Sequence, residues 1–209
     1  MNKQQSLDID IVSGREQANN LQWAKALGIG AFLGLAWGTS LRAWMTVLAL
    51  EFGDYPRYTW NGTFLMIVLP SVLMGGLLSG AKYAADTKRS KYWRWAALAP
   101  ILLVVGPLLF VPDFIPTLLE EGLGGGAIAV VLVGLFGGYG LSSLGNRWLR
   151  GLSLLLAITV TFATPYALFF ADNLGSVTAR QMFGALHFVI LMLLLMVTTR
   201  IPYQVQVAS

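Results

Sequence analysis

The sequence predicts an all-α membrane protein, a bundle of about six transmembrane helices with both termini in the cytoplasm. Hydrophobic residues make up 56% of the 209 residues and charged residues only 11%, whereas soluble domains carry about 25% charged residues. The charges cluster in short segments. Between them lie continuous apolar runs of roughly 20 residues, the length that an α-helix needs to cross a hydrocarbon core of about 30 Å. Continuous rather than alternating runs favour helices over barrel strands.

The elements follow in order along the chain. Segment 1–22 is polar and lacks the apolar core of a signal peptide, so we expect a flexible cytoplasmic tail there. Segment 23–201 is expected to form one transmembrane domain, because no long soluble segment interrupts it, and 202–209 a short cytoplasmic tail. The expected helices are 23–50, 63–84, 93–111, 125–144, 149–170 and 181–199.

The loop charges predict the orientation of these helices. Lys and Arg are enriched in short cytoplasmic loops, and here basic loops alternate with acidic ones. The loops assigned to the cytoplasm contain Lys82, Lys88, Arg89, Lys91, Arg94, Arg147 and Arg150, whereas the opposite side has only Arg57 and Arg180 among several acidic residues. One missed helix would break this alternation. The pattern predicts a multi-pass protein of the cell (plasma or inner) membrane.

Composition also limits the partners and cofactors. The chain contains no cysteine and one histidine, which excludes disulfides, cysteine-ligated metals and multi-histidine metal sites. No cofactor is expected. The net charge of +4 comes from the membrane-flanking loops, so we expect a lipid bilayer rather than nucleic acid as the partner.

Small residues predict where helices approach closely. In lipid, helix association depends on close backbone contact more than on burial of apolar side chains. We therefore expect the first, second and fourth helices to contact one another, and we assign packing roles to Gly30, Gly34, Gly38, Gly75, Gly76 and Gly137. The same faces are alternatively docking surfaces for a partner membrane subunit or a second copy.

Two ionisable residues lie within the expected helices, where a charge is costly and marks a functional candidate. Arg42 shares the side of the first helix that carries Gly38, and His187 lies in the last helix. Each has a structural alternative: Arg42 as a snorkelling or ion-paired residue, and His187 as a satisfied packing group. With neighbouring polar groups they form a predicted ligand-binding set, open to the outside: Arg42, Asp113, Thr164, Gln181 and His187.

Prolines add a possible means of shaping a cavity. Pro165 lies within the fifth helix and several prolines crowd the third helix. A proline frees backbone carbonyl groups that neighbours must satisfy. The resulting kinks favour a cavity, although such kinks also occur without one.

Three function classes are compatible with these features. In helix number, size and orientation the chain resembles the membrane substrate-capture subunits of energy-coupling-factor transporters, which implies binding or transport of a small molecule or lipid; no residue is carried over. The alternative is a non-catalytic accessory or assembly subunit.

An intramembrane enzyme is the third class, and no catalytic site is predicted for it. Rhomboid proteases share a six-helix core and a histidine in the last helix, and Gly140-Leu141-Ser142 is similar to their serine motif. However, Ser142 and His187 are expected in opposite halves of the membrane, too far apart for a nucleophile and its base.

Overall fold

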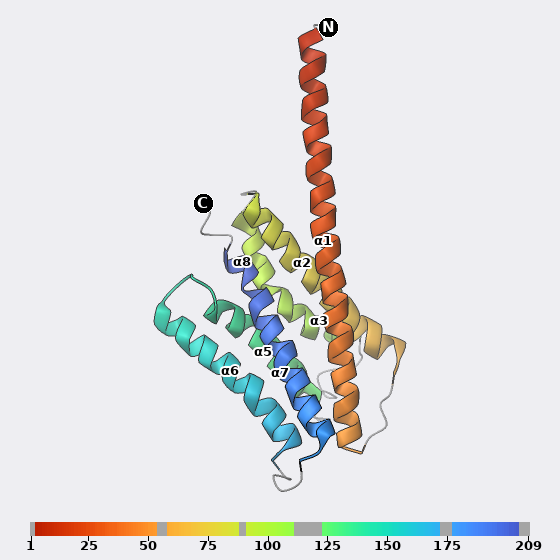
Figure 1. Ribbon diagram of the computed structural model, residues 1–209, viewed down its shortest axis with the longest axis vertical. Helices are drawn as coiled ribbons and strands as arrows, with labels where there is room; N and C mark the ends of the chain where they lie inside the picture. The colour runs from red at the N-terminus through yellow and green to blue at the C-terminus, as the bar shows by residue number, and fades with distance from the viewer. Residues whose placement is uncertain (1–2, 54–57, 88–90, 111–122, 172–176, 205–209) are drawn as a thin grey trace.

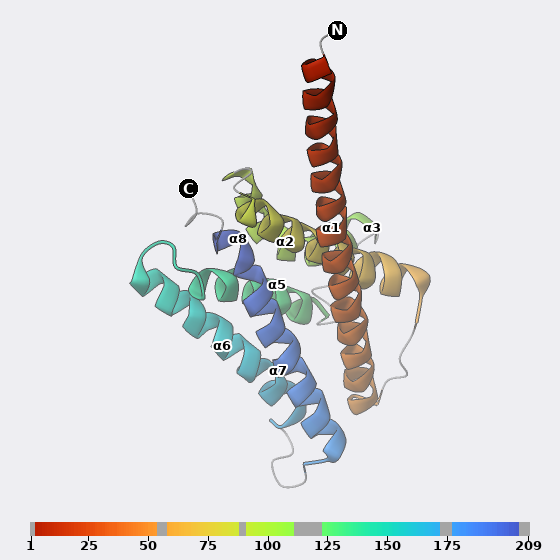
Figure 2. The ribbon, with the colours of Figure 1, turned by 45° about the horizontal axis from the view of Figure 1, so that its top comes forward.

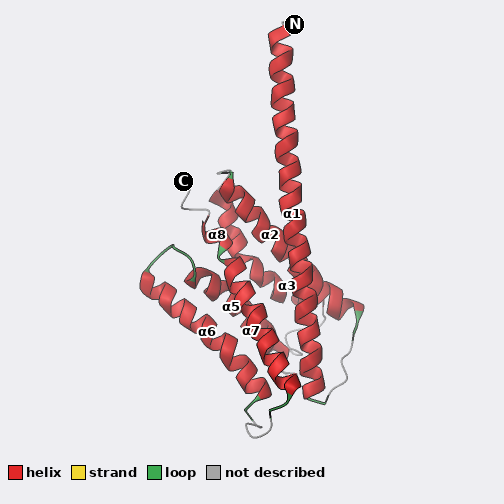
Figure 3. Cartoon of the chain, in the orientation of Figure 1, coloured by secondary structure: helices red, strands yellow, loops and turns green. Residues whose placement is uncertain are grey.

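All regular secondary structure in the described residues is helical. The structure, a computed structural model, describes residues 3–53, 58–87, 91–110, 123–171 and 177–204 (Figures 1 and 3). Helices occupy each of the six expected apolar segments, so the all-α prediction is confirmed.

The first helix, α1, is longer than expected. It spans Lys3–Glu51, 49 residues, whereas the sequence predicted a start near Trp23. The segment before Trp23 contains no proline and only one glycine, Gly14, so no residue type in it breaks a helix. The N-terminal part of α1 extends well beyond the other helices (Figures 1 and 2). The segment that was expected to be a flexible tail is therefore helical from Lys3 onward.

The second and third segments each change helix type at a proline. The π-helical η1 (Asn61–Val68) leads directly into α2 (Leu69–Asp86). The Leu69 N–H donates to the Phe64 carbonyl, five residues back, and Pro70, next in the chain, has no N–H to donate. In the third segment the 3₁₀-helical η2 (Lys91–Ile101) contains Pro100 and continues as α3 (Leu102–Phe110).

The C-terminal half consists of α5 (Leu123–Gly140), α6 (Arg147–Phe169), α7 (Ala179–Thr199) and the single turn α8 (Ile201–Gln204). Two of these helices have side-chain caps that explain where they begin. The Asn146 side chain accepts from the Trp148 N–H at the start of α6. Thr178 and Gln181 form a reciprocal capping box at the start of α7.

Four helical segments in the described part of the chain are long and apolar enough to cross a membrane. Two further apolar helices, Trp93–Val105 and Ile128–Gly140, are shorter. The six spans and their orientation therefore stay predictions. The four long segments are Asn19–Glu51, Asn61–Asp86, Arg147–Phe169 and Ala179–Gln204.

The surface composition agrees with a membrane environment. The core contains Phe188, Met192 and Leu195, which are fully buried in α7. Outside it, large apolar side chains remain open over the outer faces of α6 and α7; Leu152, for example, is 64% exposed. An apolar surface of this extent is rare on soluble monomers and is compatible with contact to lipid.

The helices α1 and α2 pack with their backbones in contact along small residues. A Cβ atom added to Gly34 would lie 2.1 Å from the Ser71 carbonyl oxygen, and one added to Gly30 would lie 2.4 Å from the Gly75 carbonyl oxygen. Gly38 faces Ser71 in the same contact. Four of the six predicted packing glycines thus lie along the α1–α2 contact: Gly30, Gly34, Gly38 and Gly75.

The other two predicted glycines have different surroundings. At Gly76 an added Cβ would be 4.0 Å from its nearest neighbour, the Leu27 carbonyl oxygen, because Gly76 is turned about 100° from Gly75 around the helix. Gly137 lies against Met196 of α7. The expected tight contact of the fourth helix with the first two is wrong, since α5 packs mainly against α6 and α7.

Candidate functional site

Polar side chains on one face of α1 join it to α7. Trp37, Ser40 and Trp44 follow at three- and four-residue spacing, which places them on one helix face. The Trp37 indole Nε1 donates to the Leu191 carbonyl oxygen at 3.1 Å, and the Trp44 Nε1 donates to the Gly184 carbonyl oxygen at 2.9 Å. We call this contact, completed by Ser40 and His187, the α1–α7 seam.

His187 occupies the middle of the α1–α7 seam. Its Nε2 is joined to the Ser40 hydroxyl by a 2.8 Å hydrogen bond. The other ring nitrogen, Nδ1, is buried and makes no hydrogen bond to the described residues, and the ring lies against Phe183. The ring is thus held between α1 and α7, which supports the packing role for His187.

Gln181 is also committed to protein contacts. Its Nε2 donates to the Glu51 carboxylate at 2.5 Å, joining the end of α1 to the start of α7. Its Oε1 accepts from the Thr178 N–H at 2.9 Å. Gln181 is only 5% exposed, so both ends of its amide are used within the fold.

Arg42 lies on the other interior face of α1, toward η1. Its Nε donates to the Thr63 hydroxyl at 3.4 Å, and its guanidinium lies 4.4 Å from the centre of the Tyr58 ring. Tyr58 is in turn hydrogen-bonded to Thr46. Arg42 thus joins α1 to η1, on the side of Gly38 that the sequence indicated.

Of the predicted ligand-binding residues, Gln181 and His187 share the contact between α1 and α7, whereas Arg42 and Thr164 lie elsewhere. Ser40, the partner of His187, and Arg42 are two positions apart and therefore point about 200° apart around α1. Thr164 is half-buried on α6, which packs against α5 and α7 rather than α1. Asp113 lies outside the described residues. The polar groups that the sequence gathered into one site are thus mostly distributed over different helix contacts.

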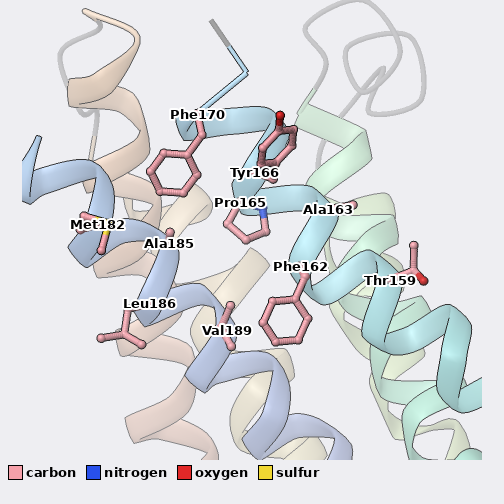
Figure 4. Close-up of a pocket in the computed structure, with 10 residues that line it drawn as sticks. All are labelled: Thr159, Phe162, Ala163, Pro165, Tyr166, Phe170, Met182, Ala185, Leu186 and Val189. Atoms are coloured by element: carbon pink, nitrogen blue, oxygen red, sulfur yellow. The ribbon is translucent and has the colours of Figure 1, made fainter. Parts of the chain in front are cut away.

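An apolar groove of about 680 Å³ lies between α6 and α7. Pro165 forms part of its wall, and the side chains of Phe162 and Val189 face each other across it (Figure 4). Tyr166 and Thr159 bring hydroxyl groups. The lining residues are Thr159, Phe162, Ala163, Pro165, Tyr166, Phe170, Met182, Ala185, Leu186 and Val189.

The sequence contains a signal for the α6–α7 groove that the prediction, which was based on polar residues, did not use. Phe162, Tyr166 and Phe170 recur at four-residue spacing around Pro165. Such a stripe lies on one helix face, and a proline beside it favours a local opening. The prediction used Pro165 and the polar groups beside it, such as Thr164, but not the aromatic spacing.

A second apolar groove lies between α2 and η2. It has a volume of about 490 Å³ and is lined by Leu77, Trp93, Trp95 and Ala96. The two tryptophans belong to the expected cytoplasmic boundary of the third apolar segment.

The serine and the histidine considered for an intramembrane protease lie in different contacts. The Ser142 hydroxyl donates to the Tyr139 carbonyl oxygen at the end of α5, whereas His187 pairs with Ser40. Within the ranges described above, no three His, Cys, Asp or Glu side chains are close enough to hold a metal ion.

Comparisons with protein-family models, with curated proteins and with solved structures found no match to this chain.

Proposed function

We propose that this chain is a multi-pass protein of the cell membrane that binds a lipid-like molecule in the α6–α7 groove. The observation that carries the proposal is the lining of the groove, which is apolar except for two hydroxyl groups. Its volume of about 680 Å³ falls within the roughly 300–1,000 Å³ typical of ligand pockets. A groove that opens sideways on an apolar surface is accessible to molecules dissolved in the bilayer.

The two hydroxyl groups suggest how a bound molecule is oriented in the groove. Tyr166 is 52% exposed, and Thr159 lies seven residues away on the same helix, about 10 Å along the axis. Tyrosine is typical of the membrane–water interface, where its apolar ring contacts hydrocarbon and its hydroxyl group contacts water. We assign the polar end of the bound molecule to Tyr166 and its hydrocarbon tail to the region around Phe162 and Val189.

The proposal includes six spans with both termini in the cytoplasm. The alternating loop charges support it, and so does the arrangement of the helix ends. The projecting part of α1 and the turn α8 lie toward one end of the bundle, while the facing ends of α6 and α7 lie at the other (Figure 1). In this orientation Tyr166 lies in the outer half of the membrane.

Lipid binding in this apolar groove has more support than binding or transport of a small molecule or lipid through an outward-facing polar cavity, the version that the sequence favoured. Arg42, His187 and Gln181 each have protein partners, so a polar ligand would have to displace existing contacts. An apolar molecule in the α6–α7 groove displaces none of them.

Photo-crosslinking tests the proposal. A diazirine-bearing fatty acid is incorporated into cellular lipids, the protein is purified after illumination, and the labelled peptides are mapped by mass spectrometry. Labelling should concentrate on groove residues of α6 and α7. It should fall in Ala185→Trp, which fills the groove, and persist in Leu194→Trp, a 52% exposed position of α7 outside the groove. Uniform labelling of all apolar helix faces would reject a specific site.

One observation favours the second candidate, an accessory subunit. The N-terminal part of α1 projects past the bundle as a continuous helix (Figure 1), and a helix that lies in a groove of another protein is a recurring mode of recognition. Native mass spectrometry of the protein extracted in mild detergent measures this directly. A stoichiometric second protein that dissociates when segment 1–18 is deleted would favour the accessory role.

A further inference from the structure

The N-terminal extension of α1, residues 3–18, continues the helix well beyond the other helices (Figures 1 and 2). Asn19, which follows it, is joined to α2 by a hydrogen bond from the Tyr83 hydroxyl. Most helical stability in proteins comes from packing of an apolar face rather than from helix propensity. A continuous helix at this place therefore calls for a packing partner.

Apolar and small residues recur in the extension at alternating four- and three-residue spacing, which is the heptad pattern of a coiled coil. The a positions are Ile11 and Ala18, and the d positions are Leu7, Gly14 and Leu21. Isoleucine at a and leucine at d favour two parallel strands. Glycine and alanine fill little of the core, so this pair of strands is weak on its own.

The same heptad positions continue into the apolar part of α1, on the side turned away from α2. Phe32 is 68% exposed and lies two positions from Gly34, which places it about 200° around the helix from the α1–α2 contact. A Cβ added at Gly28 would meet nothing within 4 Å. The a and d positions from residue 21 onward are all exposed: Leu21, Lys25, Gly28, Phe32, Leu35 and Thr39.

The charges of the extension are complementary between two copies of this chain. In a parallel pair, a residue at g faces the e residue five positions later on the other helix, and such pairs set the choice of partner. Lys3 at g then meets Asp8 at e, and Asp10 at g meets Arg15 at e. Both pairs have opposite charges. None of these four residues has an opposite charge three or four positions away in the sequence, the spacing that pairs charges along one helix.

We propose that α1 forms a parallel, two-stranded coiled coil with α1 of a second copy of this chain, through the heptad positions from Leu7 to Gly28. Two copies inserted the same way into one membrane have their N-termini on the same side, so their α1 helices pair in parallel. The two-fold axis then lies along the membrane normal and the assembly closes as a dimer. Confinement to the bilayer raises the effective concentration, which offsets the weak core and Lys25 at an a position.

Disulfide crosslinking of the full chain tests the pairing, since the chain has no native cysteine. Positions a and d of two copies face each other, whereas f faces outward. Under copper-catalysed oxidation in membranes, Ile11→Cys and Leu21→Cys should form a disulfide-linked dimer. Ile9→Cys is the matched control, because it replaces the same residue type two positions away at f and should form little dimer.

Charge reversal tests whether the partner is a second copy. Energy transfer between donor-labelled and acceptor-labelled full chains in vesicles, at several protein-to-lipid ratios, gives the dimer affinity. Asp10→Arg replaces two attractive pairs by two repulsive ones and should weaken the dimer about tenfold. Asp10→Arg/Arg15→Asp restores opposite charges only if the chain pairs with itself, and should recover the original affinity. Circular dichroism checks that each variant is folded.

Equal crosslinking of Ile9→Cys and Ile11→Cys would show random collision and overturn the proposal, and so would a protein that stays monomeric at all ratios. Failure of Asp10→Arg/Arg15→Asp to recover affinity would reject the second copy as partner. One copy bound to a different protein through the extension would assign it to the accessory role instead. Fatty-acid labelling of the α6–α7 groove does not depend on these outcomes, so this proposal and the proposed function can fail separately.

Discussion

Neighbouring glycines on one helix can have opposite roles, as Gly75 and Gly76 of α2 do. Gly75 touches the backbone of α1, whereas Gly76 has open space beside it. The sequence assigned both to packing because spacing alone does not fix the rotation of a helix relative to its partner. That rotation depends on contacts far apart in the chain, which no local pattern contains.

The first prediction compares two glycine-to-alanine changes. Gly34→Ala would place a Cβ 2.1 Å from the Ser71 carbonyl oxygen, so α1 and α2 must separate, and we expect a loss of about 1–3 kcal/mol. Gly76→Ala meets only an atom at 4.0 Å and should be neutral or slightly stabilising. Thermal unfolding in detergent, followed by circular dichroism, measures both. Equal melting temperatures would contradict the close contact.

A second prediction concerns the turn between α5 and α6. Gly145 has φ +81°, a conformation that costs a residue with a Cβ about 1–2 kcal/mol. Gly145→Ala should lower the melting temperature for this reason, and because its Cβ would lie 2.5 Å from the Tyr139 hydroxyl. Tyr139→Phe should partly rescue it by removing the hydroxyl. Gly151→Ala is the control, since a Cβ there meets nothing within 4 Å.

At the scale of elements, the α1–α7 seam is the clearest polar contact between helices distant in sequence. The third prediction is that Ser40→Ala and His187→Ala each destabilise the protein and that the double variant loses less than the sum. We expect a coupling of about 0.5–1.5 kcal/mol for one hydrogen bond. Thr39→Ala is the control for Ser40, because the Thr39 hydroxyl bonds only within its own helix. Additive losses would show that Ser40 and His187 do not interact.

The apolar segments that form helices, and the contact of the first helix with the second, were predictable from the sequence. The helix types, the start of α1 and the pairing of α5 were not. Apolar runs locate α2, α6 and α7 closely, because each run is bounded by charge or by capping residues such as Asn146 and Thr178. The π-helical and 3₁₀-helical segments beside Pro70 and Pro100 were not predicted. A proline in the sequence indicates that the α-helical hydrogen bonding is interrupted, but not which helix type replaces it. His187 was singled out correctly as a polar group in a helix, but its partner Ser40 lies 147 residues away.

For the whole molecule, the fourth prediction concerns membrane topology. The chain has no native cysteine, so single cysteines can be labelled in intact cells without background. Thr59→Cys and Val177→Cys should react with a membrane-impermeant thiol reagent, whereas Thr87→Cys and Arg147→Cys should react only after the membrane is opened. Asp54, Glu120 and Asn173 are further external positions predicted from the sequence, and all three lie outside the described residues. The reverse pattern would invert the orientation and move Tyr166 to the inner half.

The length of α1 has a mechanical consequence. At 1.5 Å per residue its 49 residues extend about 74 Å, more than twice a hydrocarbon core of about 30 Å. Asn19 is still tied to the bundle, because its carbonyl oxygen accepts from the Tyr83 hydroxyl, so the helix that precedes it acts as a stiff arm of roughly 24 Å. Whatever is attached to residue 3 is held at a set height from the bundle, and any tilt of α1 in the membrane is magnified into a sideways displacement at that end.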